Sequence, residues 1–208
     1  LRAALARGRG VVLATAHFGS WEALNVAAGG LGLPRATFIA KPVRNARIDV
    51  HLKRVRERTG NRLAYREGAM LACAGALRRG EIACSVIDMA VLPRDGGIFC
   101  DFFGTAATTS TALPFLALRL RAPLLFALCR PIDGGLRYVV EGREIPVTPT
   151  GDLEADILRV TRALNEALEE AVRRCPEAWI WSYKRWKFRP SELPGAFPDY
   201  ALWVHPRW

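Results

Sequence analysis

The sequence predicts a single α/β domain, with a mixed, mostly parallel sheet flanked by helices. Short apolar runs alternate with helix-like stretches along the chain, which is the pattern of this fold class. A length of 208 residues suffices for one such domain with a full core, but not for two independent ones. We expect the domain to occupy residues 1–190, followed by a proline-containing, irregular tail over residues 191–208.

Five apolar runs have the length and composition of buried strands. They lie at residues 11–16, 36–40, 82–87, 98–103 and 123–129. The glycine pairs at 96–97 and 134–135 predict turns between strands.

Five helices are expected between and after these runs. They cover residues 20–29, 46–59, 69–79, 112–120 and 152–175. Gly60 and Gly80 end the second and third, because glycine is the common residue just past a helix end. The last helix begins near Asp152, carries apolar residues at spacings of three and four, and stops before Pro176.

The start of the chain predicts a piece of a longer protein. Residues 1–10 have the pattern of the charged end of a helix that stops at glycine. The most apolar segment, 112–129, is interrupted by Arg119, Arg121 and Pro123 and is unsuited to crossing a bilayer. We therefore expect any N-terminal membrane anchor to precede Leu1.

The net charge of +10 predicts an anionic partner: nucleic acid, anionic lipid or a phosphate-bearing substrate. The cations recur within folded-looking segments, so the sequence predicts a basic surface on a folded domain. The five cysteines contain no CxxC pair, and most have apolar neighbours, which predicts reduced core thiols, a cytosolic setting and no metal or other cofactor. They are Cys73, Cys84, Cys100, Cys129 and Cys175.

An aromatic and basic segment, residues 179–189, allows three interpretations. Its tryptophans and cations suit a membrane interface, and the same composition suits stacking on single-stranded nucleic acid. Alternatively, the tryptophans pack inward while the cations face water. We expect inward packing for at least one of Trp179 and Trp181.

Residues 17–22, His-Phe-Gly-Ser-Trp-Glu, are the best candidate for reaction chemistry. On one continuous helix His17 and Glu22 would lie about 140° apart, so they can meet only if His17 precedes the helix. Gly19 allows the bend, Ser20 suits the N-cap, and Glu22 then falls in the first turn. The sequence predicts a general base, His17, oriented by Glu22; a histidine that merely completes a strand end is the alternative.

Several separated segments resemble the bacterial lipid A biosynthesis acyltransferases, the late or secondary acyltransferases of the lysophospholipid acyltransferase superfamily. The segments that carry the resemblance are 17–22, Lys41-Pro42 with Asn45, the helix with Arg54 and Arg56, residues 80–88, Phe102-Phe103-Gly104 with Thr108-Thr109, and 179–187. The resemblance implies a glycerol-3-phosphate acyltransferase-like fold. It also implies a domain at the cytoplasmic face of the inner membrane, where it acts in lipopolysaccharide biosynthesis.

The activity that this resemblance implies is transfer of a fatty acyl group from an acyl thioester to a hydroxyl of a lipid A precursor or similar glycolipid. The donor would be acyl carrier protein or acyl-CoA. In this family the histidine is the general base and the acid orients it, which correspond to His17 and Glu22. Lys41, Arg54, Arg56 and Asp88 correspond to substrate-binding positions. A related branch acylates phosphatidylinositol mannosides, and other relatives act on lysophospholipids.

Two functions of other classes remain open at this point. A basic nucleic-acid-binding module would explain the charge but would leave His17 and Glu22 without a purpose, so we expect no nucleic-acid partner. A thioesterase or other hydrolase could use the same base on water, or Ser20 as a nucleophile. Gly-Ser-Trp-Glu is not the G-x-S-x-G elbow, which disfavours that second route.

Overall fold

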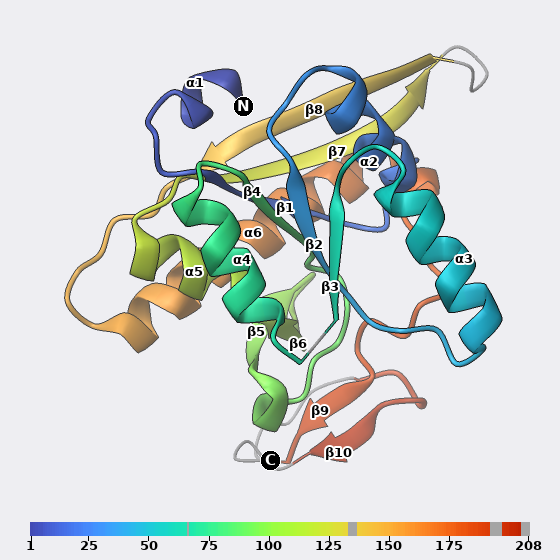
Figure 1. Cartoon of the computed structure of the whole chain (residues 1–208). Helices are drawn as coiled ribbons and strands as arrows, with labels where there is room; N and C mark the ends of the chain where they lie inside the picture. The colour runs from blue at the N-terminus through green and yellow to red at the C-terminus, as the bar shows by residue number, and fades with distance from the viewer. Residues whose placement is uncertain (66, 133–136, 192–196, 205–208) are drawn as a thin grey trace.

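The computed structural model describes the chain except residues 66, 133–136, 192–196 and 205–208. A six-stranded sheet forms its centre, in the order β3-β2-β4-β1-β7-β8 (Figure 1). The strands are β1 (Val11–Thr15), β2 (Ala36–Ala40), β3 (Arg62–Tyr65), β4 (Ile82–Val86), β7 (Leu124–Ile132) and β8 (Arg137–Ile145). Neighbours from β3 to β7 pair in parallel, and β8 alone runs antiparallel to its neighbour. The predicted mixed, mostly parallel sheet is therefore confirmed.

Helices cover both faces of this sheet. They are α1 (Arg2–Leu5), α2 (Trp21–Gly30), α3 (Ala46–Glu57), α4 (Ala69–Arg78), α5 (Ala112–Leu120) and α6 (Leu153–Arg174), with short 3₁₀ turns η1 (Pro93–Asp95) and η3 (Pro176–Ala178). Among the described residues, none of the helices combines the length and apolar character needed to cross a bilayer.

Successive side chains of a strand point to opposite faces of the sheet, so the core consists of two clusters. Val12 and Ala14 of β1 join the larger cluster, which α4, α5 and α6 complete. Leu13 points the other way and packs in a smaller cluster with Leu24 of α2. Because β1 is buried on both faces, all five of its residues are inaccessible, as expected for a central parallel strand. The burial of β1 therefore fixes where the strand ends and where the residues after it, from Ala16 onward, begin.

The five predicted helices are confirmed within a few residues, including the Asp152 N-cap, whose side chain accepts from the Glu154 and Ala155 amides. Ser20 is the N-cap residue of α2, although its side chain forms no capping hydrogen bond. The short strand β3 and the partly polar β8 were not predicted, because neither has a sustained apolar run. The predicted turn at 134–135 lies outside the described residues.

One predicted strand belongs to a separate hairpin rather than to the main sheet. β5 (Gly97–Phe102) pairs antiparallel with β6 (Thr105–Ser110). The two central turn residues, Phe103 and Gly104, both have positive φ, which is the conformation of a tight hairpin turn. The apolar content of 98–103 indicated a strand but not its partner.

The tail expected to be irregular contains a short strand. β10 (Leu202–Val204) pairs in parallel with β9 (Phe188–Pro190), and the Arg189 guanidinium lies 3.5 Å from the centre of the Trp203 ring. A pairing of only three residues leaves no periodicity that sequence reasoning could detect.

A buried amide joins the strands to α2 and α3. The Asn61 Oδ1 atom accepts from the Ala36 amide at 2.9 Å, and its Nδ2 donates to the Asn25 Oδ1 atom at 2.6 Å. Asn25 in turn donates to the Arg56 carbonyl at 3.1 Å. Asn61, which is 4% exposed, therefore helps to hold Asn25, the α2 side chain that bonds α3.

We predict that Asn61→Ala lowers the free energy of unfolding by about 2–3 kcal/mol, because it leaves the Ala36 amide and the Oδ1 atom of buried Asn25 without this hydrogen-bond partner. Urea denaturation measures this, with Arg62→Ala as the control, because Arg62 directly follows Asn61 and is the exposed first residue of β3. Equal stability of both variants would show that the network contributes nothing.

Candidate active site

His17 lies two residues beyond the carboxyl end of β1, and backbone contacts fix its position. Its carbonyl accepts from the Ile180 amide at 3.1 Å, and the Gly19 amide donates to Ala178 at 2.8 Å. Gly19 has φ +57°, and a Cβ there would lie 2.3 Å from the Cys129 carbonyl oxygen. Only glycine fits this bend. The sequence-predicted bend at Gly19 therefore places His17 ahead of α2, as expected.

The partner of His17 is Asp88. Thr15 of β1 and Val86 of β4 are register partners in adjacent parallel strands, so the residues two positions further on also lie opposite one another. The Asp88 carboxylate accepts from the His17 backbone amide at 2.8 Å, and its other oxygen lies 2.9 Å from His17 Nδ1. The Trp179 indole donates to the same carboxylate at 3.2 Å.

This contact determines the tautomer of His17. An ionised carboxylate only accepts, so Nδ1 carries a hydrogen, and in the neutral imidazole the free lone pair is on Nε2. The His17 side chain is 23% exposed whereas that of Asp88 is 2% exposed. The arrangement is a buried carboxylate behind an imidazole that remains accessible, which is the geometry of an oriented general base.

The pKa of Asp88 reflects two opposing effects. Burial acts to raise the pKa, but the hydrogen bonds and charge of His17 and the bond from Trp179 outweigh it, so the pKa lies below its ordinary value. The carboxylate is therefore ionised at neutral pH.

Glu22 does not contact the imidazole in the way the sequence predicted. Its carboxylate forms an ion pair with Arg56, whose Nε and Nη2 atoms lie 3.1 and 2.5 Å from Oε1. The α2 helix directs Glu22 toward α3, while the strand register places Asp88 against His17. Asp88 was expected among substrate-binding residues, and in the structure its carboxylate contacts His17 and Trp179.

Lys41 and Arg54 are both exposed. Lys41 directly follows β2, and Arg54 lies on α3 two residues before Arg56, so the two arginines point to different sides of the helix. The structure thus brings four of the six predicted residues together as two pairs, His17 with Asp88 and Glu22 with Arg56, and places Lys41 and Arg54 on the surface.

The segment after η3 supports the site from behind. Trp179 is 4% exposed, as predicted for one of the two tryptophans, whereas Trp181 is 57% exposed. Tyr183 accepts at its hydroxyl oxygen from the Ala90 amide at 2.9 Å, which holds the loop that follows Asp88.

Arg185 differs from the expected surface cation. It is fully buried, donates to the Thr108 carbonyl and the Thr109 hydroxyl at 2.6 Å each, and lies 5.0 Å from the centre of the Phe102 ring. Burial lowers its pKa to about 10, while the charge of Asp88 opposes that change. Segment 179–189 is therefore not the uniform membrane interface that its composition suggested.

The backbone amides that could stabilise an oxyanion near His17 belong to residues 19–22. The Gly19 and Ser20 amides donate to Ala178 and Cys129 at 2.8 Å each and are occupied. The next two, Trp21 and Glu22, occupy the first positions of α2, where the helix offers their amides no partner. The Trp21 ring also contacts the imidazole edge-on, with centroids 5.0 Å apart.

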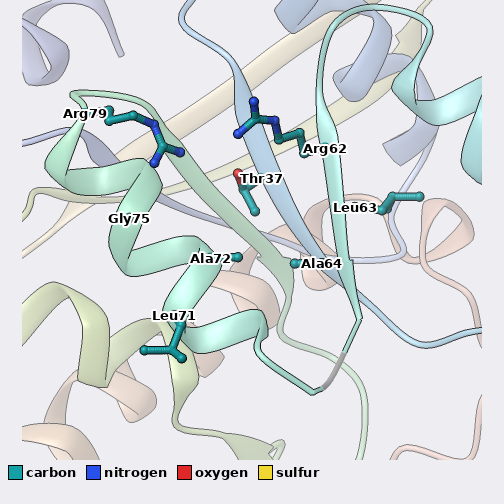
Figure 2. Close-up of a pocket in the computed structure, with 8 residues that line it drawn as sticks. All are labelled: Thr37, Arg62, Leu63, Ala64, Leu71, Ala72, Gly75 and Arg79. Atoms are coloured by element: carbon teal, nitrogen blue, oxygen red, sulfur yellow. The ribbon is translucent and has the colours of Figure 1, made fainter.

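Two surface hollows of the described structure lie away from His17. One, of about 200 Å³, lies between β2, β3 and α4, with Arg62 and Arg79 at one end and Leu71 at the other (Figure 2). Arg62 begins β3, so these cations lie near the amino ends of the strands, opposite His17. In the part of the chain that the structure describes, no three metal-binding side chains are grouped.

The cysteines are placed largely as predicted. Cys73, Cys84, Cys100 and Cys129 are buried, and Cys175 is partly exposed with its thiol directed at Glu177.

Comparisons with known proteins identify a family to which the sequence is similar. The family model for bacterial lipid A biosynthesis acyltransferase matches residues 1–188. A lipid A biosynthesis acyltransferase of Haemophilus influenzae is 27% identical over 178 residues, which cover 86% of this chain and 54% of that protein. The lipid A biosynthesis palmitoleoyltransferase of Escherichia coli is 28% identical over 194 residues, 91% of this chain and 60% of that protein. The chain thus spans little more than half the length of these relatives.

The depressed pKa of Asp88 predicts a pH-dependent contribution to stability. A carboxyl whose folded pKa is lowered stabilises the fold above its unfolded pKa, near 3.8, and loses that contribution as pH falls through the folded pKa. We expect Asp88→Asn to lower the free energy of unfolding at pH 6 and the difference from the parent chain to narrow below pH 3.8. Urea denaturation across this range tests it; a constant difference would mean that the carboxylate charge is not responsible.

Proposed function

Because the chain belongs to the bacterial lipid A biosynthesis acyltransferase family, we propose that it transfers a fatty acyl group from an acyl thioester to a hydroxyl of a lipid A precursor or similar glycolipid, with His17 as the general base. The observation that supports this proposal is the contact between His17 Nδ1 and the buried Asp88 carboxylate, which leaves Nε2 of a partly exposed imidazole as the nitrogen available to a substrate. The donor would be acyl carrier protein or acyl-CoA.

The proposed reaction needs no nucleophile from the protein. His17 Nε2 accepts the proton of the acceptor hydroxyl as that oxygen attacks the thioester carbonyl carbon. The tetrahedral intermediate collapses, the C–S bond breaks, and the imidazolium returns the proton to the departing thiolate. Asp88 stabilises the imidazolium through its contact with Nδ1. The Trp21 and Glu22 amides are our candidates for stabilising the oxyanion.

We assign Glu22 to substrate binding through Arg56. The ion pair uses the Arg56 Nε–H and one Nη2–H, which leaves further donors of the guanidinium for a phosphate. With exposed Lys41, Arg56 would bind phosphate of the acceptor headgroup or of the donor's phosphopantetheine. A location at the inner membrane follows from a lipid acceptor and forms part of the same proposal.

The isosteric variants Asp88→Asn and Glu22→Gln test the roles of the two carboxylates separately. We expect His17→Ala and Asp88→Asn each to lower kcat by about 10²–10⁴-fold, because the first lacks the base and the second presents an amide N–H₂ to Nδ1 and favours the wrong tautomer. Glu22→Gln should chiefly raise KM, with kcat within about tenfold, because it weakens the hold on Arg56. Mass spectrometry of lipid products, with acyl-thioester donors and candidate acceptors, provides the assay.

Circular dichroism confirms that each variant is folded. A larger loss of kcat in Glu22→Gln than in Asp88→Asn would return the orienting role to Glu22, and wild-type turnover by His17→Ala would refute the mechanism. Salt-sensitive retention on DNA without any acyl transfer would instead favour the nucleic-acid-binding function.

A further inference from the structure

The α3 helix covers little of the protein. None of its residues, all of which the structure describes, is buried, and it lies at the outer edge of the molecule beside β3 (Figure 1). An isolated helix of this length is marginal in water, so contacts with the rest of the domain must stabilise α3. Its structure is held mainly by polar contacts at its ends and by the Asn25 bond to Arg56.

Both carboxylates of α3 are used on its inner side. Asp49 accepts from the Val43 amide at 2.8 Å and the Tyr65 hydroxyl at 2.7 Å. Glu57 accepts from the Leu63 amide at 3.0 Å. No acid of this helix is therefore left to neutralise the cations on its outer side.

The outer side carries a continuous row of basic residues. Arg47, His51, Arg54 and Arg58 are spaced by four, three and four residues, which places them on one helical face, and all four are exposed. We call these four residues the α3 basic row. Exposed Lys41 and Arg44 precede the helix, so the same charge extends toward the carboxyl end of β2.

Aliphatic side chains flank the row. Val50 is 57% exposed on one side, and Ile48 and Val55 are each 49% exposed on the other. Cations combined with exposed apolar side chains on one helix suit a lipid surface, where both kinds of group gain: the cations meet anionic headgroups and the aliphatic groups leave water. An acidic protein partner would satisfy the cations but would not require the apolar flanks.

We propose that the outer face of α3 is the surface by which this domain docks on an anionic lipid bilayer. Arg56, on the inner side of the same helix, connects it to Glu22 and hence to the start of α2 that follows His17. Docking through α3 presents the site edge to the membrane. The inference rests on the proposed function only in that a lipid acceptor resides in a bilayer, and vesicle binding is measured without turnover.

Vesicle flotation tests the proposal with liposomes of 30% phosphatidylglycerol in phosphatidylcholine, and with phosphatidylcholine alone. We expect the whole chain to float with the anionic vesicles only. Arg47→Gln/Arg58→Gln should lower the partition coefficient by about 30-fold, since each cation near an anionic surface contributes about fivefold.

The matched control is Arg78→Gln/Arg119→Gln, which removes the same net charge from exposed positions on α4 and α5, away from α3 (Figure 1). It should float like the parent chain, as should His17→Ala, so that failed docking and failed chemistry remain distinguishable. Equal losses in both double variants would show a diffuse charge effect and overturn the proposal. Unchanged flotation of the α3 variant, with loss of binding to acidic acyl carrier protein, would overturn it in favour of a protein partner.

Discussion

The site depends on one buried carboxylate. Asp88 is 1% exposed, and a charge in that position is tolerable only when donors surround it. The donors are the His17 backbone amide, the His17 ring and the Trp179 indole. His17 and Trp179 lie 162 residues apart in the sequence. Satisfying Asp88 therefore joins the end of β1, the end of β4 and the segment after η3, and the same bonds fix which imidazole nitrogen faces outward.

The sequence was sufficient for the elements that apolar periodicity determines. The strands around His17, the bend at Gly19 and the α6 helix are all found where predicted. Sequence proximity favoured Glu22 as the partner of His17, whereas the parallel register of β1 and β4 brings Asp88 there instead. Strand order is a long-range property, and no spacing within residues 17–22 reports it. The signal that could have identified Asp88 was an acid two residues past the end of a neighbouring strand.

The sequence also could not predict which cations are buried. Arg185 stands among Lys184, Trp186 and Lys187 and shares their composition, yet it lies beneath the β5–β6 hairpin and bonds Thr108 and Thr109. The α3 helix shows the opposite case, because its cations remain on the surface while its carboxylates turn inward. Net charge alone could not separate these roles. In the structure Arg185 is buried, Arg56 pairs with Glu22, and the α3 basic row is exposed to solvent.

The central claim is that Asp88 holds His17 with the hydrogen on Nδ1 and the lone pair on Nε2. The most direct measurement is ¹⁵N NMR of the imidazole nitrogens in the folded chain near neutral pH, with assignment from the loss of signals in His17→Ala. The structure predicts a protonated Nδ1 and an unprotonated Nε2 for His17, and a shift toward the opposite tautomer in Asp88→Asn. An Nε2–H tautomer in the parent chain, unaffected by Asp88→Asn, would contradict the account.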